Sequence, residues 1–196
     1  PVADPAAITT YLICASARDK RKVLLSGMGA DEVFAGYPRH RAMVLADWYR
    51  RVVPTSARER LIGPLVSRLP AGRPGPFQRL FRNSKAFARG ASLDFTHRYL
   101  DFGTYFDARA RRDLYSEALA PVAAGWDAYD QHLDHFKRVR GEHPLDQVLY
   151  VDMKTFLPCL NLTYTDKMSM AASVEVRVPF LDHELVEMAA RMPAEL

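Results

Sequence analysis

The stretch that decides the fold class is Val23-Leu24-Leu25-Ser26-Gly27-Met28-Gly29-Ala30-Asp31-Glu32. Its first three residues form a short apolar run closed by Ser26-Gly27, which is the pattern of a buried parallel strand. Asp31 and Glu32 then precede apolar residues at helical spacing, and acidic side chains in a first turn favour the helix dipole. The sequence therefore predicts a strand near residues 22–25, a tight glycine turn, and a helix whose apolar pattern continues to Tyr49.

Helix is expected to dominate the rest of the chain. Asp4-Pro5 reads as an N-cap followed by proline at the first helical position, and this helix should end near Arg18. A capping-box pattern at Ser56–Glu59 begins another helix, whereas Pro70–Pro76 reads as a loop because its prolines lack backbone donors. Further helices are expected at residues 77–87, 92–102, 107–119, 126–139, 144–157 and 182–192.

These elements indicate an α/β fold of which one part is represented. Parallel strands occur in sets joined by crossover connections, so a single clear strand cannot form a doubly wound sheet alone. We expect the other strands to lie upstream. The chain begins with Pro1 rather than Met, and we interpret it as a piece of a longer protein.

The glycine turn is a candidate phosphate site. Gly27 and Gly29 allow a sharp backbone turn with amide donors facing an anion, and the following helix start adds its dipole. Asp31 would then hold Mg²⁺, which takes few protein carboxylates and completes its shell with water and phosphate oxygens. The alternative is an ordinary tight turn in which Asp31 and Glu32 only cap a helix.

A second candidate segment runs from Asp166 to His183 and contains Glu175-Val176-Arg177. On an extended segment Glu175 and Arg177 share one side, opposite the valines at 174, 176 and 178. The pair could clamp a substrate or form a structural ion pair at a strand edge. Asp182 is expected to cap the following helix.

Together the two segments resemble the asparagine synthetase family. The matching residues are Ser26-Gly27-Met28-Gly29-Ala30-Asp31-Glu32 with Gly36-Tyr37, and later Asp166-Lys167-Met168-Ser169-Met170 and Glu175-Val176-Arg177-Val178-Pro179-Phe180-Leu181-Asp182. Asp152 to Pro158 also looks like the family, so the resemblance covers nearly the whole chain. It implies a partial ATP pyrophosphatase fold of the adenine nucleotide alpha hydrolase type.

The resemblance implies a glutamine-hydrolysing asparagine synthase that uses ATP to convert aspartate to a β-aspartyl adenylate, which ammonia then attacks. Residues 1–196 would be the C-terminal part of this amide-forming domain. The N-terminal glutaminase domain, which supplies ammonia and would be the partner within the same chain, is absent from these residues. The pyrophosphate loop S-G-G-x-D-S is absent too, so we expect residues 1–196 to be inactive alone.

The family's site maps onto residues of both segments. Ser26, Gly27 and Gly29 correspond to nucleotide-binding positions, Asp31 to a Mg²⁺ ligand, and Glu175 and Arg177 to catalytic positions. Met28 stands where many members have Glu and the related β-lactam synthetases have Tyr. A thioether cannot accept a proton or donate a strong hydrogen bond. Another group could take the role of the family's Glu, or the acceptor substrate could differ, as in a β-lactam synthetase-like or peptide-cyclising ligase.

Composition sets the remaining expectations. Of 196 residues, 48% are hydrophobic and 26% charged, which is ordinary for a globular protein. No apolar run approaches the roughly 20 residues of a membrane span, so no membrane partner is expected. Cys14 and Cys159 are isolated, which favours neither disulfides nor zinc and fits a reducing cytoplasm. The sequence does not fix the oligomeric state and leaves a homodimer open.

The net charge is +4, and basic residues gather in the middle of the chain. They are Arg58, Arg60, Arg68, Arg73, Arg79, Arg82, Lys85 and Arg89. Because they are scattered at helical spacing, we interpret them as solvated helix faces and expect no nucleic-acid partner. A helical module that binds nucleic acid or an acidic protein is the remote alternative.

Overall fold

The computed structural model describes residues 4–68, 78–104, 106 and 108–194. The chain divides into two compact units, one formed by the residues up to Tyr37 with those from His135 onward, and one formed by Pro38–Asp134. The expected loop at 70–76 lies outside the described residues. Among the described residues, no helix has the length and apolar character that crossing a bilayer requires.

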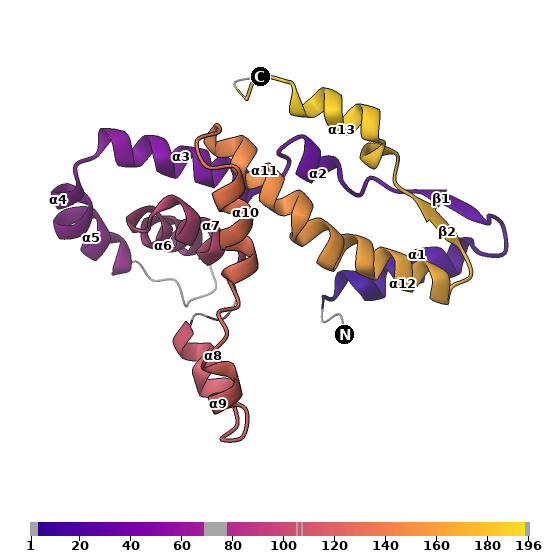
Figure 1. The fold of residues 1–196 in the computed structure, drawn as a ribbon, viewed down its shortest axis with the longest axis horizontal. Helices are drawn as coiled ribbons and strands as arrows, with labels where there is room; N and C mark the ends of the chain where they lie inside the picture. The colour runs from indigo at the N-terminus through magenta and orange to yellow at the C-terminus, as the bar shows by residue number, and fades with distance from the viewer. Residues whose placement is uncertain (1–3, 69–77, 105, 107, 195–196) are drawn as a thin grey trace. The chain divides into compact units, whose positions relative to one another are not determined.

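The first unit combines helices with a small parallel sheet (Figure 1). Its elements are α1 (Ala6–Ala17), β1 (Val23–Leu25), α2 (Ala30–Val33), α11 (Pro144–Lys154), the π-helical turn η2 (Leu157–Leu162), α12 (Thr163–Ala171), β2 (Glu175–Arg177), the 3₁₀ turn η3 (Pro179–Leu181) and α13 (His183–Ala190). α1 packs along α12, and one face of the strands covers this pair. The core consists of Cys14, Ala172 and Val174, with Leu24 and Val176 against them.

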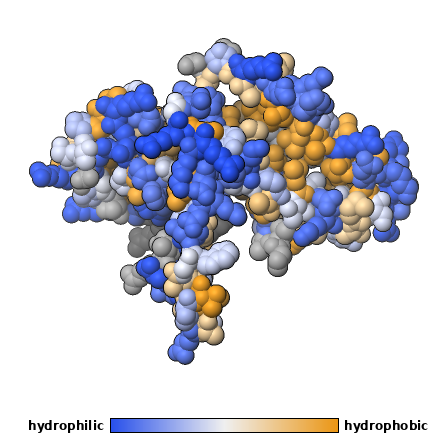
Figure 2. Space-filling view, viewed as in Figure 1, coloured by the Kyte–Doolittle hydropathy of each residue, from blue (hydrophilic) through white to orange (hydrophobic). Residues whose placement is uncertain are grey.

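The predicted strand is confirmed, and a second strand joins it. β1 pairs in parallel with β2, so that Val23, Leu24 and Leu25 lie beside Glu175, Val176 and Arg177. The sequence predicted the second segment as extended but not its pairing, because the two strands are distant in the chain and neither carries a local signal for the other. The outer face of the pair is open, because Leu25 is 74% exposed, and Figure 2 shows apolar residues on the visible face of this unit.

The second unit is helical in its described part. Its elements are α3 (Pro38–Val52), α4 (Thr55–Ala57), the π-helical turn η1 (Arg58–Ile62), α5 (Gly63–Ser67), α6 (Gln78–Ser92), α7 (Phe95–Gly103), α8 (Ala108–Leu114) and α9 (Ala120–Ala123). α10 (Asp130–Arg138) contains the point where the chain returns to the first unit. α3, α6 and α7 pack on one another through Met43, Ala46 and Ala91. Gly90 permits this packing, because a Cβ there would collide with the ring of Phe102.

The helix expected from Asp31 to Tyr49 is wrong as a single element. α2 ends at Val33 and α3 begins at Pro38. Between them Ala35 adopts a left-handed conformation with φ of 59°, and the amide of Gly36 donates to the carbonyl of Asp31. Proline also disfavours helical backbone at the residue before it. The chain therefore turns sharply before α3.

Candidate active site

The parallel pairing brings the two sequence motifs together at one end of the strands. β1 runs into the glycine turn, and β2 runs into Val178 and η3 at the same edge. The amide of Ser26 donates to the carbonyl of Arg177 at 2.8 Å, which extends the ladder by one bond beyond β1. The carboxyl ends of parallel strands are the usual position of ligand sites in α/β sheets.

The hydrogen bonds of the turn determine which amides can reach a ligand. The Ser26 amide is committed to Arg177, and the Met28 amide donates to Ser26 Oγ at 3.2 Å. Within the described residues, the amides of Gly27 and Gly29 donate no hydrogen bond. The Ser26 hydroxyl accepts from Met28 and still carries its own proton. Gly27 is exposed whereas Gly29 is buried, so the turn offers the Gly27 amide and the Ser26 hydroxyl, and Ser26 contributes by its side chain rather than by its backbone.

The two glycines of the turn have different structural roles. Gly29 has φ of +92°, a region that L side chains rarely adopt, and a Cβ there would collide with the side chain of Leu181. Gly27 is exposed, and a Cβ there would meet no atom within 4 Å. Gly29 is therefore required by the fold, whereas Gly27 leaves open space that a ligand can enter.

We expect Gly29→Ala to lower the free energy of unfolding by about 2 kcal/mol, because it adds backbone strain and a clash with Leu181. Gly27→Ala is the matched control and should change this free energy by less than about 0.5 kcal/mol. Urea denaturation followed by circular dichroism measures both. Equal losses at the two positions would show that the assigned roles are wrong.

Asp31 is exposed in the first turn of α2, which is only one helical turn long. Its carboxylate lies so close to Gly36 that a Cβ there would collide with Asp31 Oδ1, so the glycine makes room for the carboxylate. In the described part of the chain, no group of three or more His, Cys, Asp and Glu could hold a metal by itself. A single exposed carboxylate still fits Mg²⁺ when hydrogen-bond donors that can bind a phosphate lie in the same motif, because Mg²⁺ draws most of its ligands from water and phosphate.

A buried polar triad fixes α2 to η2. Glu32 is 1% exposed, and its Oε1 accepts from Tyr37 Oη at 2.9 Å and from Asn161 Nδ2 at 2.7 Å. Asn161 Nδ2 also donates to Tyr37 Oη at 3.1 Å. Burial and the neighbouring Glu32 raise the pKa of Tyr37, so its hydroxyl stays protonated and donates. The triad holds in place the helical turn that carries Asp31.

Sequence reasoning missed both Glu32 and Asn161 as structural residues. Glu32 was interpreted only as a helix cap, yet a carboxylate followed by an apolar residue and a nearby tyrosine is a possible sign of burial. Asn161 gives no such sign, because it lies 129 positions away from Glu32 in the chain.

Met28 contacts a tyrosine from α12. Its Sδ accepts from Tyr164 Oη at 3.8 Å, and Tyr164 is 6% exposed. Burial raises the pKa of Tyr164, so this hydroxyl is a proton-bearing donor near neutral pH and not a base. Tyr164 is the polar group that the structure places beside position 28.

Glu175 and Arg177 lie on the exposed face of β2, as the alternation predicts. Arg177 Nε donates to Glu175 Oε1 at 2.7 Å, and this bond raises the pKa of Arg177. Both side chains are exposed, so the pair adds little to stability. Within the described residues Arg177 has no other carboxylate partner, and no ion pair joins it to Asp31. Asp182 caps α13 as expected, accepting from the amides of Glu184 and Leu185.

The chain resembles a known protein family over its whole length. The sequence profile described as asparagine synthase matches residues 1–196. The chain belongs to the asparagine synthase family. No solved structure matches it closely.

Curated relatives cover the chain almost completely. It is 32% identical over 194 residues to a putative glutamine-hydrolyzing asparagine synthetase of Mycobacterium tuberculosis. The matched region is 99% of this chain and 28% of that protein. It is 30% identical to glutamine-hydrolyzing asparagine synthetase 1 of Bacillus subtilis, over all of this chain and 29% of that protein. Amidase chyE of Penicillium rubens is 29% identical over 89% of this chain and 26% of its own length. This chain therefore spans less than a third of the length of each of these relatives.

Proposed function

We propose that this chain is part of an ATP-dependent ligase that forms asparagine from aspartate through a β-aspartyl adenylate. The observation that carries the proposal is the register of β1 and β2, which sets Arg177 beside the start of the glycine turn, with its ion-pair partner Glu175 two residues earlier on β2. One edge of the sheet then offers donors for phosphate oxygens next to a guanidinium that suits a carboxylate.

The residues of the turn suit a nucleotide substrate. The Gly27 amide and the Ser26 hydroxyl can donate to phosphate oxygens, and the open space at Gly27 lets a phosphate approach the backbone. Asp31 would bind Mg²⁺, which neutralises negative charge on the departing pyrophosphate. Because Asp31 is exposed and anchored through the Glu32 triad, it can take this role without rearrangement of α2.

The pair on β2 suits the carboxylate substrate. Glu175 occupies the Nε of Arg177 and thereby orients its guanidinium. The two Nη groups are left for a carboxylate, which they can bind in the bidentate manner typical of arginine. We further propose that the ammonia derives from glutamine at a glutaminase domain, and this proposal is supported by relatives that are named glutamine-hydrolyzing.

Product analysis of the intact protein tests this function. With aspartate, glutamine and MgATP we expect AMP and asparagine in equal amounts, measured by chromatography. The control omits aspartate and should release no AMP above background. The proposal would be overturned by a folded protein that forms neither AMP nor asparagine.

A second candidate is an amide-forming ligase with another carboxylate or amine substrate. Met28 favours it, because the thioether packs against Tyr164 and cannot take part in proton transfer. The similarity to proteins named amidases is in keeping with varied substrates in the family. AMP release that requires a carboxylic acid other than aspartate, without asparagine, would select this candidate over the first.

A further inference from the structure

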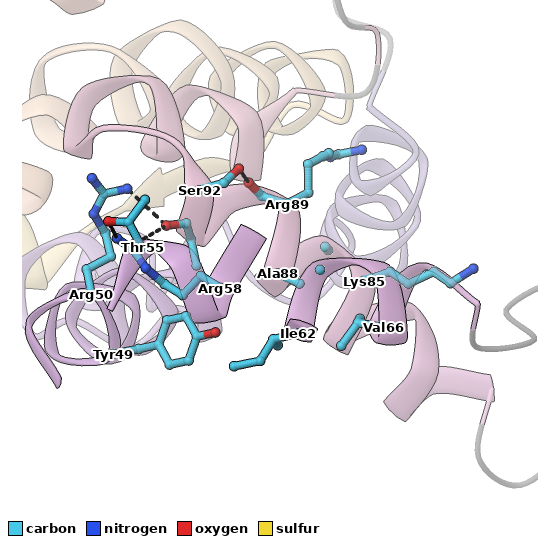
Figure 3. Close-up of a pocket in the computed structure, with 13 residues that line it drawn as sticks. Tyr49, Arg50, Thr55, Arg58, Ile62, Val66, Lys85, Ala88, Arg89 and Ser92 are labelled. Carbon is cyan, nitrogen blue, oxygen red and sulfur yellow. Dashed lines mark hydrogen bonds between the residues drawn. The ribbon is translucent and has the colours of Figure 1, made fainter. Parts of the chain in front are cut away.

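A cavity of about 780 Å³ lies within the helices of the second unit, between α3, the α4–α5 segment and α6 (Figure 3). This volume falls in the roughly 300–1,000 Å³ range of small-molecule pockets. Half-buried Tyr49, Ile62, Val66 and Ala88 form an apolar part of its lining. In Figure 3 the end of Ile62 points towards the ring of Tyr49. None of the lining residues belongs to the glycine turn or to β2.

Two arginines form another part of the lining. Arg50 Nη1 donates to the carbonyls of Ala91 and Leu93 at 3.0 and 2.6 Å, where α6 ends. Arg58 Nη1 donates to the carbonyl of Ala91 at 3.3 Å, and Nη2 donates to Thr55 Oγ1 at 2.7 Å. Figure 3 shows Arg50, Arg58 and Thr55 grouped together. These bonds hold the guanidiniums in place, and they leave Nε and Nη2 of Arg50 without a partner among the described residues.

The positive charge of this group is not neutralised by ion pairs. In the described part of the chain, neither Arg50 nor Arg58 has a carboxylate within ion-pair distance, and Arg58 Nε is buried without a hydrogen-bond partner. Two acids of this unit pair with other cations, Asp47 with Arg51 and Asp94 with His97.

A third guanidinium lies behind these two. Arg98 is 1% exposed and donates to the carbonyls of Met43 and Leu93. Burial and the charge of Arg50 lower the pKa of Arg98, whereas the carboxylates of Asp47 and Asp94 oppose this shift. Buried charges are costly without compensation, and an unpaired cationic group beside a cavity is therefore a site for an anion.

The other basic residues of the cavity do not belong to this group. In Figure 3 the side chains of Lys85 and Arg89 extend away from Arg50 and Arg58. Arg89 already pairs with Asp101 at 3.1 Å. The cavity therefore has a localised cationic end and an apolar remainder.

We propose that this cavity binds a small amphipathic anion, in which a carboxylate or phosphate monoester contacts Arg50 and Arg58 and an apolar body lies against Tyr49, Ile62 and Val66. An inorganic anion would leave the apolar part empty, and a neutral apolar molecule would leave the guanidiniums unpaired. The site is separate from the proposed nucleotide site and does not depend on its function.

Isothermal titration calorimetry of the intact protein with four probes tests the ligand class. Octanoate and octyl phosphate carry both the head and the body, whereas octanol has only the body and inorganic phosphate only the head. We expect the tighter of the two amphiphiles to bind at least about tenfold more tightly than octanol or phosphate, which corresponds to one charge-assisted contact. Comparison of the two amphiphiles identifies the preferred head. Equal binding of octanol and both amphiphiles, or no binding of either amphiphile, overturns the proposal.

Variants locate the binding. Arg58→Gln should weaken the amphiphile about tenfold or more, whereas Arg89→Gln, the matched control at the same cavity, should leave its affinity unchanged. Ala88→Phe fills the apolar part of the cavity and keeps both arginines, so it should abolish binding of the amphiphile. If Arg58→Gln does not fold, this variant alone tests whether the ligand binds in the cavity. Unchanged affinity in a folded Ala88→Phe protein would show that the ligand binds elsewhere.

Discussion

Replacing Asp31 by asparagine is expected to lower AMP release by the intact protein by about 100-fold or more, because a neutral amide is a poor ligand for Mg²⁺ beside phosphate. The substitution keeps the size of the side chain, and Asp31 is exposed, so the fold should be retained. The measurement is the rate of AMP formation at saturating aspartate, glutamine and MgATP. Titration with Mn²⁺ in place of Mg²⁺ would show whether metal affinity is the step affected.

Asp19→Asn is the matched control for this prediction. Asp19 is exposed in the segment before β1, and its ion pair with Arg18 is at the surface. This variant should retain the wild-type rate, and both variants should have the wild-type circular dichroism spectrum. A folded Asp31→Asn protein that releases AMP at the wild-type rate would contradict the assignment of Asp31.

Replacing Asn161 by leucine is expected to lower the free energy of unfolding by about 3 kcal/mol. The change leaves the buried Glu32 carboxylate without its 2.7 Å amide donor, and hydrogen bonds to charged groups are worth about 1.5–3 kcal/mol before the cost of the unsatisfied group is added. Urea denaturation followed by far-ultraviolet circular dichroism measures the loss.

Three further proteins make this measurement specific: Asn83→Leu, Glu32→Met, and the double variant Glu32→Met with Asn161→Leu. Asn83→Leu is the same chemical change at an exposed position of α6 and should alter the free energy of unfolding by less than about 0.5 kcal/mol. The double variant Glu32→Met with Asn161→Leu should lose less than the sum of the single losses, because replacing both partners removes the unsatisfied group. Additive losses would mean that the two side chains are not coupled.

The parts of the fold that the sequence predicted well are those set by local chemistry. The run Val23–Leu25 closed by Ser26-Gly27 became β1, and alternation placed Glu175 and Arg177 on one exposed face. Asp182 caps α13 because a short acidic side chain reaches the first free amides of a helix. In each case the interacting groups are neighbours in the chain.

The parts that failed have two causes, a local break that the apolar spacing hides and contacts between residues that are distant in the chain. The break before α3 combines a left-handed Ala35 with Pro38, and periodicity cannot detect it because the apolar spacing continues across the gap. The pairing of β1 with β2 and the triad of Glu32 with Asn161 join segments that have no local signal for each other.

The basic middle of the chain shows the same limit. Helical spacing suggested solvated faces, and exposed Arg89 fits that prediction. Arg58, however, is half-buried and turns towards the carbonyls at the end of α6. Spacing within one helix gives the direction of a side chain but not the neighbouring helix that covers it, so the cationic end of the cavity could not be predicted.

The parallel pairing of β1 with β2 also has a consequence for how the protein is made. Synthesis proceeds from the N-terminus, so β1 leaves the ribosome well before β2, and Pro38–Asp134 is completed in between. Pairings between distant segments form slowly, because a long loop must close first. We expect the helical unit to fold during translation, whereas the glycine turn acquires its final hydrogen bonds only after Arg177 has emerged. Until then the α1 residues that pack against α12 and β2 lack these partners.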